Sequence, residues 1–301
     1  MILGIRVGAL ALVLATGACA SLAPLRGEAI APGVRYWSER QSSPVAAVIH
    51  VLEVDLGRPG VELSVSAGDG SGGLEYRAAT VSEFASASGA VAAVNGGYFS
   101  PFRGGSPAGD DFYPHSGDPV NTIGASIADG AVISPVETEE DARVLAILCI
   151  NGADVVILDG QTCAPNVEDA LAAGPRLLRA GQPAMNAQAG AAYSIDRHPR
   201  TAIGLNARRD RAWLVVVDGR QPGVSEGMTL AELNVLFERL GASDALNLDG
   251  GGSSAMVAVS GGLPKLLSVP IHTGVPGRER PSANHLGVQV SARSARRSNS
   301  R

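Results

Sequence analysis

A short apolar strand leads directly into three glycines and two serines in the stretch Leu246-Asn247-Leu248-Asp249-Gly250-Gly251-Gly252-Ser253-Ser254. Residues two apart in a strand share a face, so Leu246 and Leu248 are predicted to pack inward, with Asn247 and Asp249 on the other side. Glycines remove side-chain bulk where the strand ends, and the backbone amides of such a turn can face an anion. The pattern indicates a carboxylate beside open backbone, which suits a sugar or phosphate site.

The clearest helix precedes this strand, over residues 230–240. Thr229 and Glu232 match a capping box, Gly241 follows the last turn, and apolar residues recur on one face. The helix lies between two apolar strands, 212–217 and 245–248, an order that normally means a right-handed parallel crossover. The rest of the chain is mostly short strands and turns. We therefore expect an α+β fold, with a large mixed sheet, few helices and a single catalytic domain.

Two further segments place polar residues and glycines where apolar strands end. One is Asn95-Gly96-Gly97-Tyr98-Phe99, and the other combines Arg200-Thr201-Ala202-Ile203-Gly204 with Asp218-Gly219-Arg220. Taken alone, each segment is typical of a turn. His115 and His198 have no partners at metal-ligand spacing, so structural roles are expected for both. The sequence has no Gly-x-Ser-x-Gly motif or Cys/His arrangement that would indicate acyl transfer.

Cys149 and Cys163 lie at either end of a predicted hairpin. Two strand-like runs, 144–150 and 155–158, are separated by Asn151-Gly152, a pair typical of tight hairpin turns. A disulfide between the two cysteines would suit an oxidising compartment. The alternative is that they are two unrelated thiols.

The composition excludes some classes of protein. The chain has 301 residues and a net charge of −5, which argues against a general nucleic-acid binder because such proteins need a basic surface. Aromatic residues make up only 4%, so the core is expected to be aliphatic. A chain of this length can bury such a core without a disulfide or a structural metal.

The first residues are typical of an export signal. Arg6 precedes an apolar run at 7–16, which is too short to span a bilayer, and Thr16-Gly17-Ala18-Cys19 resembles a lipobox. Lipidation of Cys19 would tether the protein to the periplasmic face of a bacterial membrane; ordinary secretion is the alternative. We divide the chain into a lipoprotein-type signal segment (1–19), a linker (20–44), a catalytic domain (45–291) and a disordered basic tail (292–301).

Taken together, the polar segments resemble the phosphodiester glycosidase family over residues 91–290. His285 stands where the family pattern favours a small residue. The motifs that carry the resemblance occur in the family's order: Asn95-Gly96-Gly97-Tyr98-Phe99, Arg200-Thr201-Ala202-Ile203-Gly204, Asp218-Gly219-Arg220, Gly227-Met228-Thr229-Leu230, the block 247–254, and Arg280-Pro281-Ser282-Ala283-Asn284-His285-Leu286-Gly287-Val288.

The resemblance implies a hydrolase that cleaves a glycosidic bond in a sugar-1-phosphodiester or a related envelope glycoside. Asp218 and Asp249 are the candidate catalytic carboxylates, because glycoside cleavage commonly uses two. Arg200 and Arg220 would bind the phosphate charge. A calcium or magnesium ion could also bind, because clustered carboxylate and amide oxygens suit hard cations. Substrate contacts are expected from Asn95, Gly96, Gly97, Tyr98, Asn247, Gly250, Gly251, Gly252 and Ser253.

Two other functions fit the same residues. One is a non-catalytic envelope lipoprotein that binds glycans, for which the carboxylates would be dispensable. The other is a glycosidase that acts on glycans without phosphate, for which the arginines would matter little. In each case the partner is a carbohydrate, with a membrane reached only through the lipid anchor and no nucleic acid involved.

Overall fold

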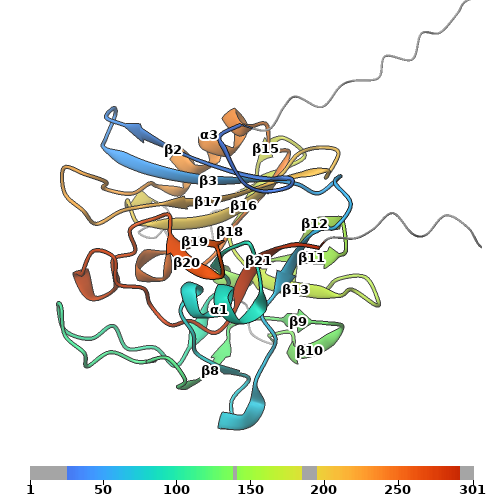
Figure 1. The fold of residues 1–301 in the computed structure, drawn as a ribbon, viewed down its shortest axis with the longest axis horizontal. Coiled ribbons are helices and arrows are strands. Elements are labelled where there is room, and N and C mark those ends of the chain that lie inside the picture. Colours follow the sequence, from blue (N-terminus) through green and yellow to red (C-terminus); the bar gives the residue numbers. More distant parts are fainter. Residues whose placement is uncertain (1–25, 138–140, 185–194, 292–301) are drawn as a thin grey trace, which may run out of the picture.

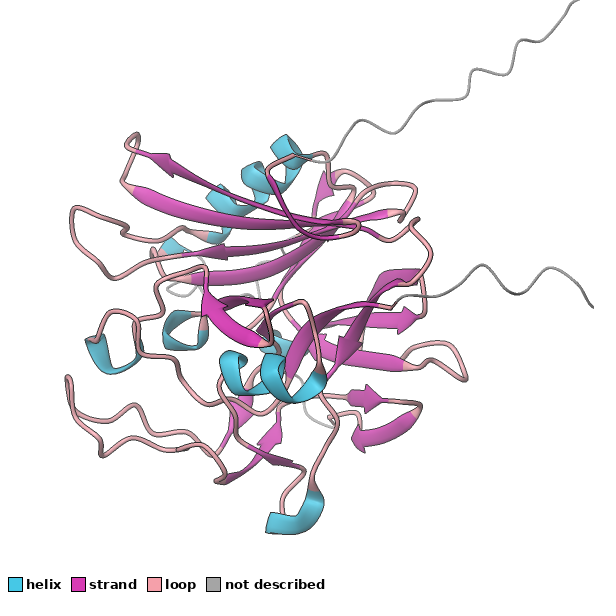
Figure 2. Ribbon diagram, in the orientation of Figure 1, coloured by secondary structure: helices cyan, strands magenta, loops and turns pink. Residues whose placement is uncertain are grey.

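The computed structural model describes residues 26–137, 141–184 and 195–291. Its strands form four sheets, accompanied by a few short helices (Figure 2), which confirms the α+β class. Every ladder between the named strands is antiparallel, so the sheets are antiparallel and not mixed. No helix in these described ranges is long and apolar enough to cross a membrane. Cys19 and the segments 1–25 and 292–301 lie outside the described residues, so the lipobox and the basic tail stay predictions.

The largest sheet carries the strands that end at the polar motifs. Its spatial order is β1 (Glu28–Ala31), β2 (Val34–Gln41), β3 (Ala47–Asp55), β17 (Arg211–Val217), β16 (Arg200–Leu205), β18 (Asp244–Asn247), β14 (Arg176–Arg179) and β15 (Gln182–Pro183).

The prediction of a linker at 20–44 is wrong over residues 28–41. Strand β2 pairs with β3 along its whole length, and β1 folds back onto β2. Because β2 is near the sheet edge, most of its side chains are only partly buried. A half-exposed strand of this kind has the polar composition that also characterises a linker, so the sequence of residues 28–41 was wrongly interpreted as a linker.

Helix α3 (Leu230–Leu240) connects β17 to β18, as predicted. Both strands are antiparallel to β16, so they run parallel to each other, but β16 lies between them. The capping box is present: the Thr229 side chain accepts from the Glu232 amide, and the Glu232 carboxylate accepts from the Thr229 amide. Gly241 ends the helix in the left-handed conformation.

The other sheets lie on the opposite face of the large sheet from α3 (Figure 1). Helix α1 (Val81–Ser88), capped by Thr80 and Glu83, packs on the sheet that contains β6. One five-stranded sheet has the order β10 (Ala131–Ser134), β9 (Ser126–Ala128), β13 (Asp169–Ala173), β11 (Ala146–Asn151), β12 (Asp154–Asp159); a second has β20 (Leu263–Leu266), β19 (Met256–Ser260), β6 (Ala92–Asn95), β21 (His285–Val290), β4 (Val61–Val65); a small third has β5 (Tyr76–Arg77), β8 (Pro119–Thr122), β7 (Phe99–Ser100).

The large sheet buries both of its faces in aliphatic side chains. Leu52 and Val54 of β3 point into the main core, together with residues of β4, β6, β11 and β21. Their neighbours Ile49 and Val51 point the other way and pack against α3. This alternation follows from the two-residue period of a strand. Because β16 runs antiparallel to β17 and β18, the start of β16 and the ends of β17 and β18, where the polar motifs lie, are at the same end of the sheet.

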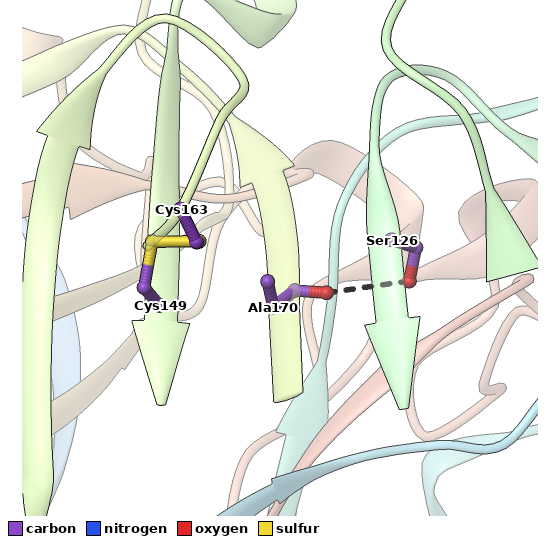
Figure 3. Close-up of a disulfide and its surroundings, with 4 residues drawn as sticks. All are labelled: Ser126, Cys149, Cys163 and Ala170. Carbon is purple, nitrogen blue, oxygen red and sulfur yellow. Dashed lines mark hydrogen bonds between the residues drawn. A yellow bond between two sulfur atoms is a disulfide. The ribbon is translucent and has the colours of Figure 1, made fainter. Parts of the chain in front are cut away.

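Cys149 of β11 and Cys163 are joined in a disulfide, with their Cα atoms 5.8 Å apart (Figure 3). The predicted hairpin between β11 and β12 is present, but its turn is Gly152-Ala153, because Asn151 is the last residue of β11 and pairs with Asp154. Figure 3 also shows Ser126 of β9 beside β13, where its hydroxyl donates to the Ala170 carbonyl. The disulfide closes the segment that contains β12, and none of the polar motifs lies within that segment.

Candidate active site

The loop after β18 is fixed by hydrogen bonds from two other motifs. The Asp249 amide donates to the Gly96 carbonyl, and the Asn95 side-chain amide donates to the Asp249 carbonyl at 2.7 Å. The Thr201 hydroxyl in turn donates to the Asn95 side-chain oxygen, also at 2.7 Å. The segments around 95, 201 and 249 thus meet at one point. The contacts from Asn95 and Gly96 hold the backbone of Asp249, and Thr201 holds the Asn95 side chain.

Asp249 faces a cleft of about 430 Å³, and it is the only carboxylate that lines it among the described residues. The Gly250 amide donates to one Asp249 carboxylate oxygen at 2.8 Å. The cleft is lined by Phe102, Gly104, Gly105, His198, Arg220, Asp249, Gly250, Gly251, Gly252, Ile271, Thr273, Gly274 and Arg280.

Arg280 lies against the glycine turn on one side of Asp249. Its Nη1 donates to the Ser253 hydroxyl at 3.2 Å, and its guanidinium lies 4.4 Å from the centre of the Phe102 ring. A Cβ atom on Gly252 would come within 2.4 Å of the Arg280 Nη2 atom. Residue 252 must therefore be glycine for this guanidinium to reach the turn.

Arg220 lies against the same turn, at Gly251. Its backbone φ is 57°, a left-handed conformation that is uncommon for a residue with a side chain. A Cβ atom on Gly251 would lie 3.0 Å from the Arg220 Nη2 atom. Strained backbone of this kind clusters at functional sites. The strain here directs the Arg220 side chain toward the loop that carries Asp249.

The charges of the cleft influence one another. Burial raises the pKa of Asp249, while the Arg280 charge, the Ser253 hydroxyl and the Gly250 amide act in the opposite direction. Burial lowers the pKa of Arg280, and the negative charge of Asp249 opposes that shift. One carboxylate among two guanidiniums leaves the cleft with surplus positive charge, so it suits an anionic ligand.

His198 is a further titratable side chain in the cleft wall. Its Nδ1 atom lies 3.5 Å from an Arg220 guanidinium nitrogen. Burial lowers the pKa of His198, and the positive charges of Arg200 and Arg220 lower it further. The ring is therefore neutral at neutral pH and can accept a proton. The sequence predicted only a structural role for His198, because it has no partner at metal-ligand spacing. The structure instead places it in the cleft wall.

Several residues predicted to touch substrate are instead buried under the cleft. Asn95 is only 1% exposed and Asn247 is fully buried, with its side-chain amide donating to the Gly174 carbonyl. The Tyr98 hydroxyl also donates to the Gly174 carbonyl. Gly96 and Gly97 pack against the Asn284 side chain and the Ala172 carbonyl. These residues support the site loop and do not line the cleft.

Arg200 is likewise fully buried. Its Nε donates to the Met228 carbonyl and one Nη to the Asp196 carbonyl, both at 2.9 Å. Arg200 therefore orders the chain before β16 and before α3, and it does not line the cleft. Of the two arginines predicted to bind phosphate, the structure places Arg220 alone at the cleft.

Asp218 does not face the cleft. It is 4% exposed, and its carboxylate accepts from the Val269 amide at 2.9 Å and lies 3.0 Å from His50 Nε2. The prediction of two carboxylates facing one ligand is therefore not borne out by this geometry, because β3 and the segment after β20 enclose Asp218 in the protein interior.

Sequence reasoning missed Arg280, Phe102 and Thr273 as cleft residues. Arg280 begins the motif 280–288, so its presence among the family motifs was an available signal. Phe102 and Thr273 belong to loops without any such pattern. Within residues 26–137, 141–184 and 195–291, no group of three or more His, Cys, Asp or Glu side chains is arranged to hold a metal ion.

The sequence matches the family model of the phosphodiester glycosidases over residues 88–289. The chain belongs to the phosphodiester glycosidase family. A comparison with curated proteins gives no significant match. The match to this family spans all the polar motifs, from Asn95 to His285, and with them every cleft residue of the 198–280 region.

Solved structures share the fold of this chain. The catalytic domain of zebrafish N-acetylglucosamine-1-phosphodiester alpha-N-acetylglucosaminidase, auto-inhibited by its pro-peptide, matches with a TM-score of 0.59 and 20% identity, over 86% of this chain and 83% of that one. A hypothetical protein from Synechocystis matches with a TM-score of 0.59 and 16% identity, over 90% of this chain and 65% of that one. A protein from Burkholderia pseudomallei K96243 matches with a TM-score of 0.56 and 20% identity, over 81% and 74%.

Proposed function

We propose that this protein hydrolyses a sugar-1-phosphodiester, releasing the sugar from a phosphate that carries a second substituent. Family membership supports a glycosidase-type hydrolase. The observation that carries the finer assignment is the position of Asp249 between Arg220 and Arg280, beside glycine backbone, in one cleft. This arrangement provides one carboxylate for the sugar carbon and two cations for the phosphate.

The charge distribution fits the chemistry of a phosphate leaving group. Cleavage of a glycoside passes through a state in which positive charge develops at the anomeric carbon, and the Asp249 carboxylate would stabilise it. A departing phosphate is already a stable anion, so it needs cations more than it needs a proton donor. Arg220 and Arg280 would bind that charge, each through a planar guanidinium that matches phosphate oxygens.

The bonds and protons balance as follows. The bond between the anomeric carbon and the phosphate oxygen breaks, and that oxygen keeps the electron pair. A water oxygen bonds to the anomeric carbon, and one water proton goes to a base in the cleft. Among the described residues of the cleft wall, Asp249 and the neutral ring of His198 could accept it.

A substrate panel tests this proposal with the purified full-length protein. The panel contains a sugar-1-phosphate methyl diester, its methyl glycoside and its 4-nitrophenyl glycoside, each in both anomers. We expect the diester to be hydrolysed with the highest kcat/KM and Arg280→Met to reduce that value selectively. Equal hydrolysis of the diester by Arg280→Met and wild type, together with a kcat/KM for the 4-nitrophenyl glycoside as high as that for the diester, would favour a phosphate-independent glycosidase. Ligand binding without turnover of any substrate would favour a glycan-binding protein.

We also propose that the protein is exported and anchored through lipid on Cys19. The apolar run at 7–16 and the lipobox-like residues before Cys19 support this, and a disulfide such as Cys149–Cys163 suits an oxidising compartment. Labelling of cells with a clickable fatty acid tests the anchor, with Cys19→Ser as the control. Label on wild type only supports the anchor, and an unlabelled, released wild-type protein contradicts it.

A further inference from the structure

Behind Arg280, outside the cleft lining, lies the fully buried side chain of His272. The Arg280 Nε atom donates to His272 Nδ1 at 3.1 Å. His272 belongs to a short 3-10 turn, His272–Gly274, whose residues Thr273 and Gly274 form part of the cleft wall. The imidazole therefore touches the guanidinium from behind, while the guanidinium itself lines the cleft.

The hydrogen bond requires a neutral imidazole with an unprotonated Nδ1 atom. Burial lowers the pKa of His272 to about 4, and the positive charges of Arg280, Arg278 and His115 act in the same direction. The proton of the neutral ring then resides on Nε2, which has no hydrogen-bond partner among the described residues. The ring thus accepts from Arg280 while its own donor is left unpaired.

We propose that His272 is a positioning residue for the anion site, holding the Arg280 guanidinium in the orientation that binds phosphate. The inference rests on the proposed function, because it assigns Arg280 to the phosphate. Three contacts define the plane of the guanidinium: His272 accepts from Nε, Ser253 accepts from Nη1, and the Phe102 ring lies against one face. Gly252 leaves space for Nη2.

His272 is itself held firmly enough to act in this way. Its amide donates to the Arg278 carbonyl at 3.1 Å, and the Phe112 ring packs edge-on at 4.4 Å between centroids. The turn is also tied to the loop 103–113, because the Ala108 amide donates to the Thr273 carbonyl at 2.7 Å. The Arg278 side chain adds bonds to both segments. The acceptor behind Arg280 therefore has a fixed position.

The unpaired Nε2–H distinguishes a positioning role from a purely structural one. A buried donor without a partner destabilises the folded state, so stability alone would favour an apolar side chain at this position. An apolar side chain at this position would, however, have no acceptor for the Arg280 Nε–H group. Replacement of His272 by leucine should then weaken phosphate binding without a matching loss of thermal stability.

The test measures binding of inorganic phosphate and of a sugar-1-phosphate by calorimetry, with full-length protein. His272→Asn places an oxygen near the Nδ1 position, whereas His272→Gln places one near the Nε2 position. We expect binding within about threefold of wild type for the asparagine variant, and a loss of tenfold or more for the glutamine and leucine variants, since hydrogen bonds to charged groups are strong. Equal binding by the asparagine and glutamine variants would overturn the proposal.

His285 provides a matched control. It is also a buried histidine whose pKa is lowered to about 4, but its Nε2 atom contacts the Ala79 carbonyl and the Ser282 hydroxyl, and His285 does not line the cleft. His285→Gln should leave phosphate affinity unchanged. If wild type itself bound neither phosphate nor the sugar-1-phosphate, the proposed function would fail. If wild type bound both and the glutamine and leucine variants of His272 bound equally well, only the role of His272 would fail.

Discussion

The Asp218 carboxylate lies 3.0 Å from the His50 imidazole, in the protein interior and not in the cleft beside Asp249. The other ring nitrogen of His50 lies 2.9 Å from the Tyr36 hydroxyl, so a chain of polar contacts crosses β17, β3 and β2. The second Asp218 oxygen accepts from the Val269 amide. Asp218 therefore joins the base of the Arg220 loop to the segment that leads into Ile271 and Thr273 of the cleft wall.

Asp218→Asn should keep most of the activity, whereas Asp218→Ala should unfold more easily. Asparagine retains the shape and an acceptor for the Val269 amide, but alanine removes the partner of that amide and of the His50 Nε2 atom, which costs on the order of 2–4 kcal/mol. Urea unfolding and kcat measurements on both variants check this. A folded Asp218→Asn protein with a kcat reduced a thousandfold would restore Asp218 as a catalytic carboxylate.

Asp249→Asn should abolish hydrolysis but not phosphate binding. Loss of the cleft carboxylate is expected to lower kcat by about a thousandfold. Phosphate affinity should stay the same or increase, because a negative charge has been removed from beside Arg280. Steady-state kinetics and phosphate calorimetry measure the two effects. Asp110→Asn, at a side chain that is 87% exposed, is the control; retention of kcat within tenfold in Asp249→Asn would contradict the assignment.

Gly251→Ala should weaken binding of an anionic substrate more than it weakens the fold. Its φ is +63°, and a Cβ atom would lie 3.0 Å from Arg220 Nη2. Gly261 has nearly the same φ, +60°, with open space around its Cβ position. Both alanine variants should lose about 1 kcal/mol of stability from backbone strain, yet only Gly251→Ala should raise KM for the diester. A similar KM in the two variants would mean that contact with Arg220 is unimportant.

Removal of the disulfide should reduce stability without affecting catalysis. The bridge joins residues separated by 14 positions, and closure of a loop of this size contributes about 3 kcal/mol. The Cys149→Ser/Cys163→Ser protein should therefore unfold at lower urea concentration, with unchanged kcat. Mass spectrometry of a non-reduced digest should find the linked peptides in wild type. Freely alkylated thiols in exported protein would show that the bond does not form.

The stability difference between wild type and His285→Gln should shrink as the pH falls. Burial lowers the pKa of His285 to about 4, against about 6.5 in the unfolded chain. Between these values the unfolded state binds more protons, so wild type loses up to about 1.4 kcal/mol per pH unit from this group as the pH falls. Glutamine can keep a donor to the Ala79 carbonyl and does not titrate. Urea unfolding at pH 7.5 and pH 5 gives the two differences; equal values would contradict the shift.

Features governed by neighbouring residues could be predicted from the sequence. Helix α3 was predicted at its observed limits, because Thr229, Glu232 and Gly241 cap its ends through contacts within a turn. The β11–β12 hairpin and the β18-to-glycine transition at Asp249 are equally local. The ordered motifs also indicated the family, which the family model confirms.

The roles of Asp218 and Asp249 could not be separated in this way, because each is an aspartate followed by glycine at the end of an apolar strand. The partner elements separate them: His50 of β3 and the Val269 amide enclose Asp218, while Arg280 and Arg220 flank Asp249. These partners lie between 29 and 168 positions away in the chain (249 to 220, and 218 to 50). Patterns among neighbouring residues were therefore enough to predict the helix, the hairpin and the family. Which carboxylate faces the cleft depends on segments that meet after folding, because those segments set the burial and the charge around each side chain.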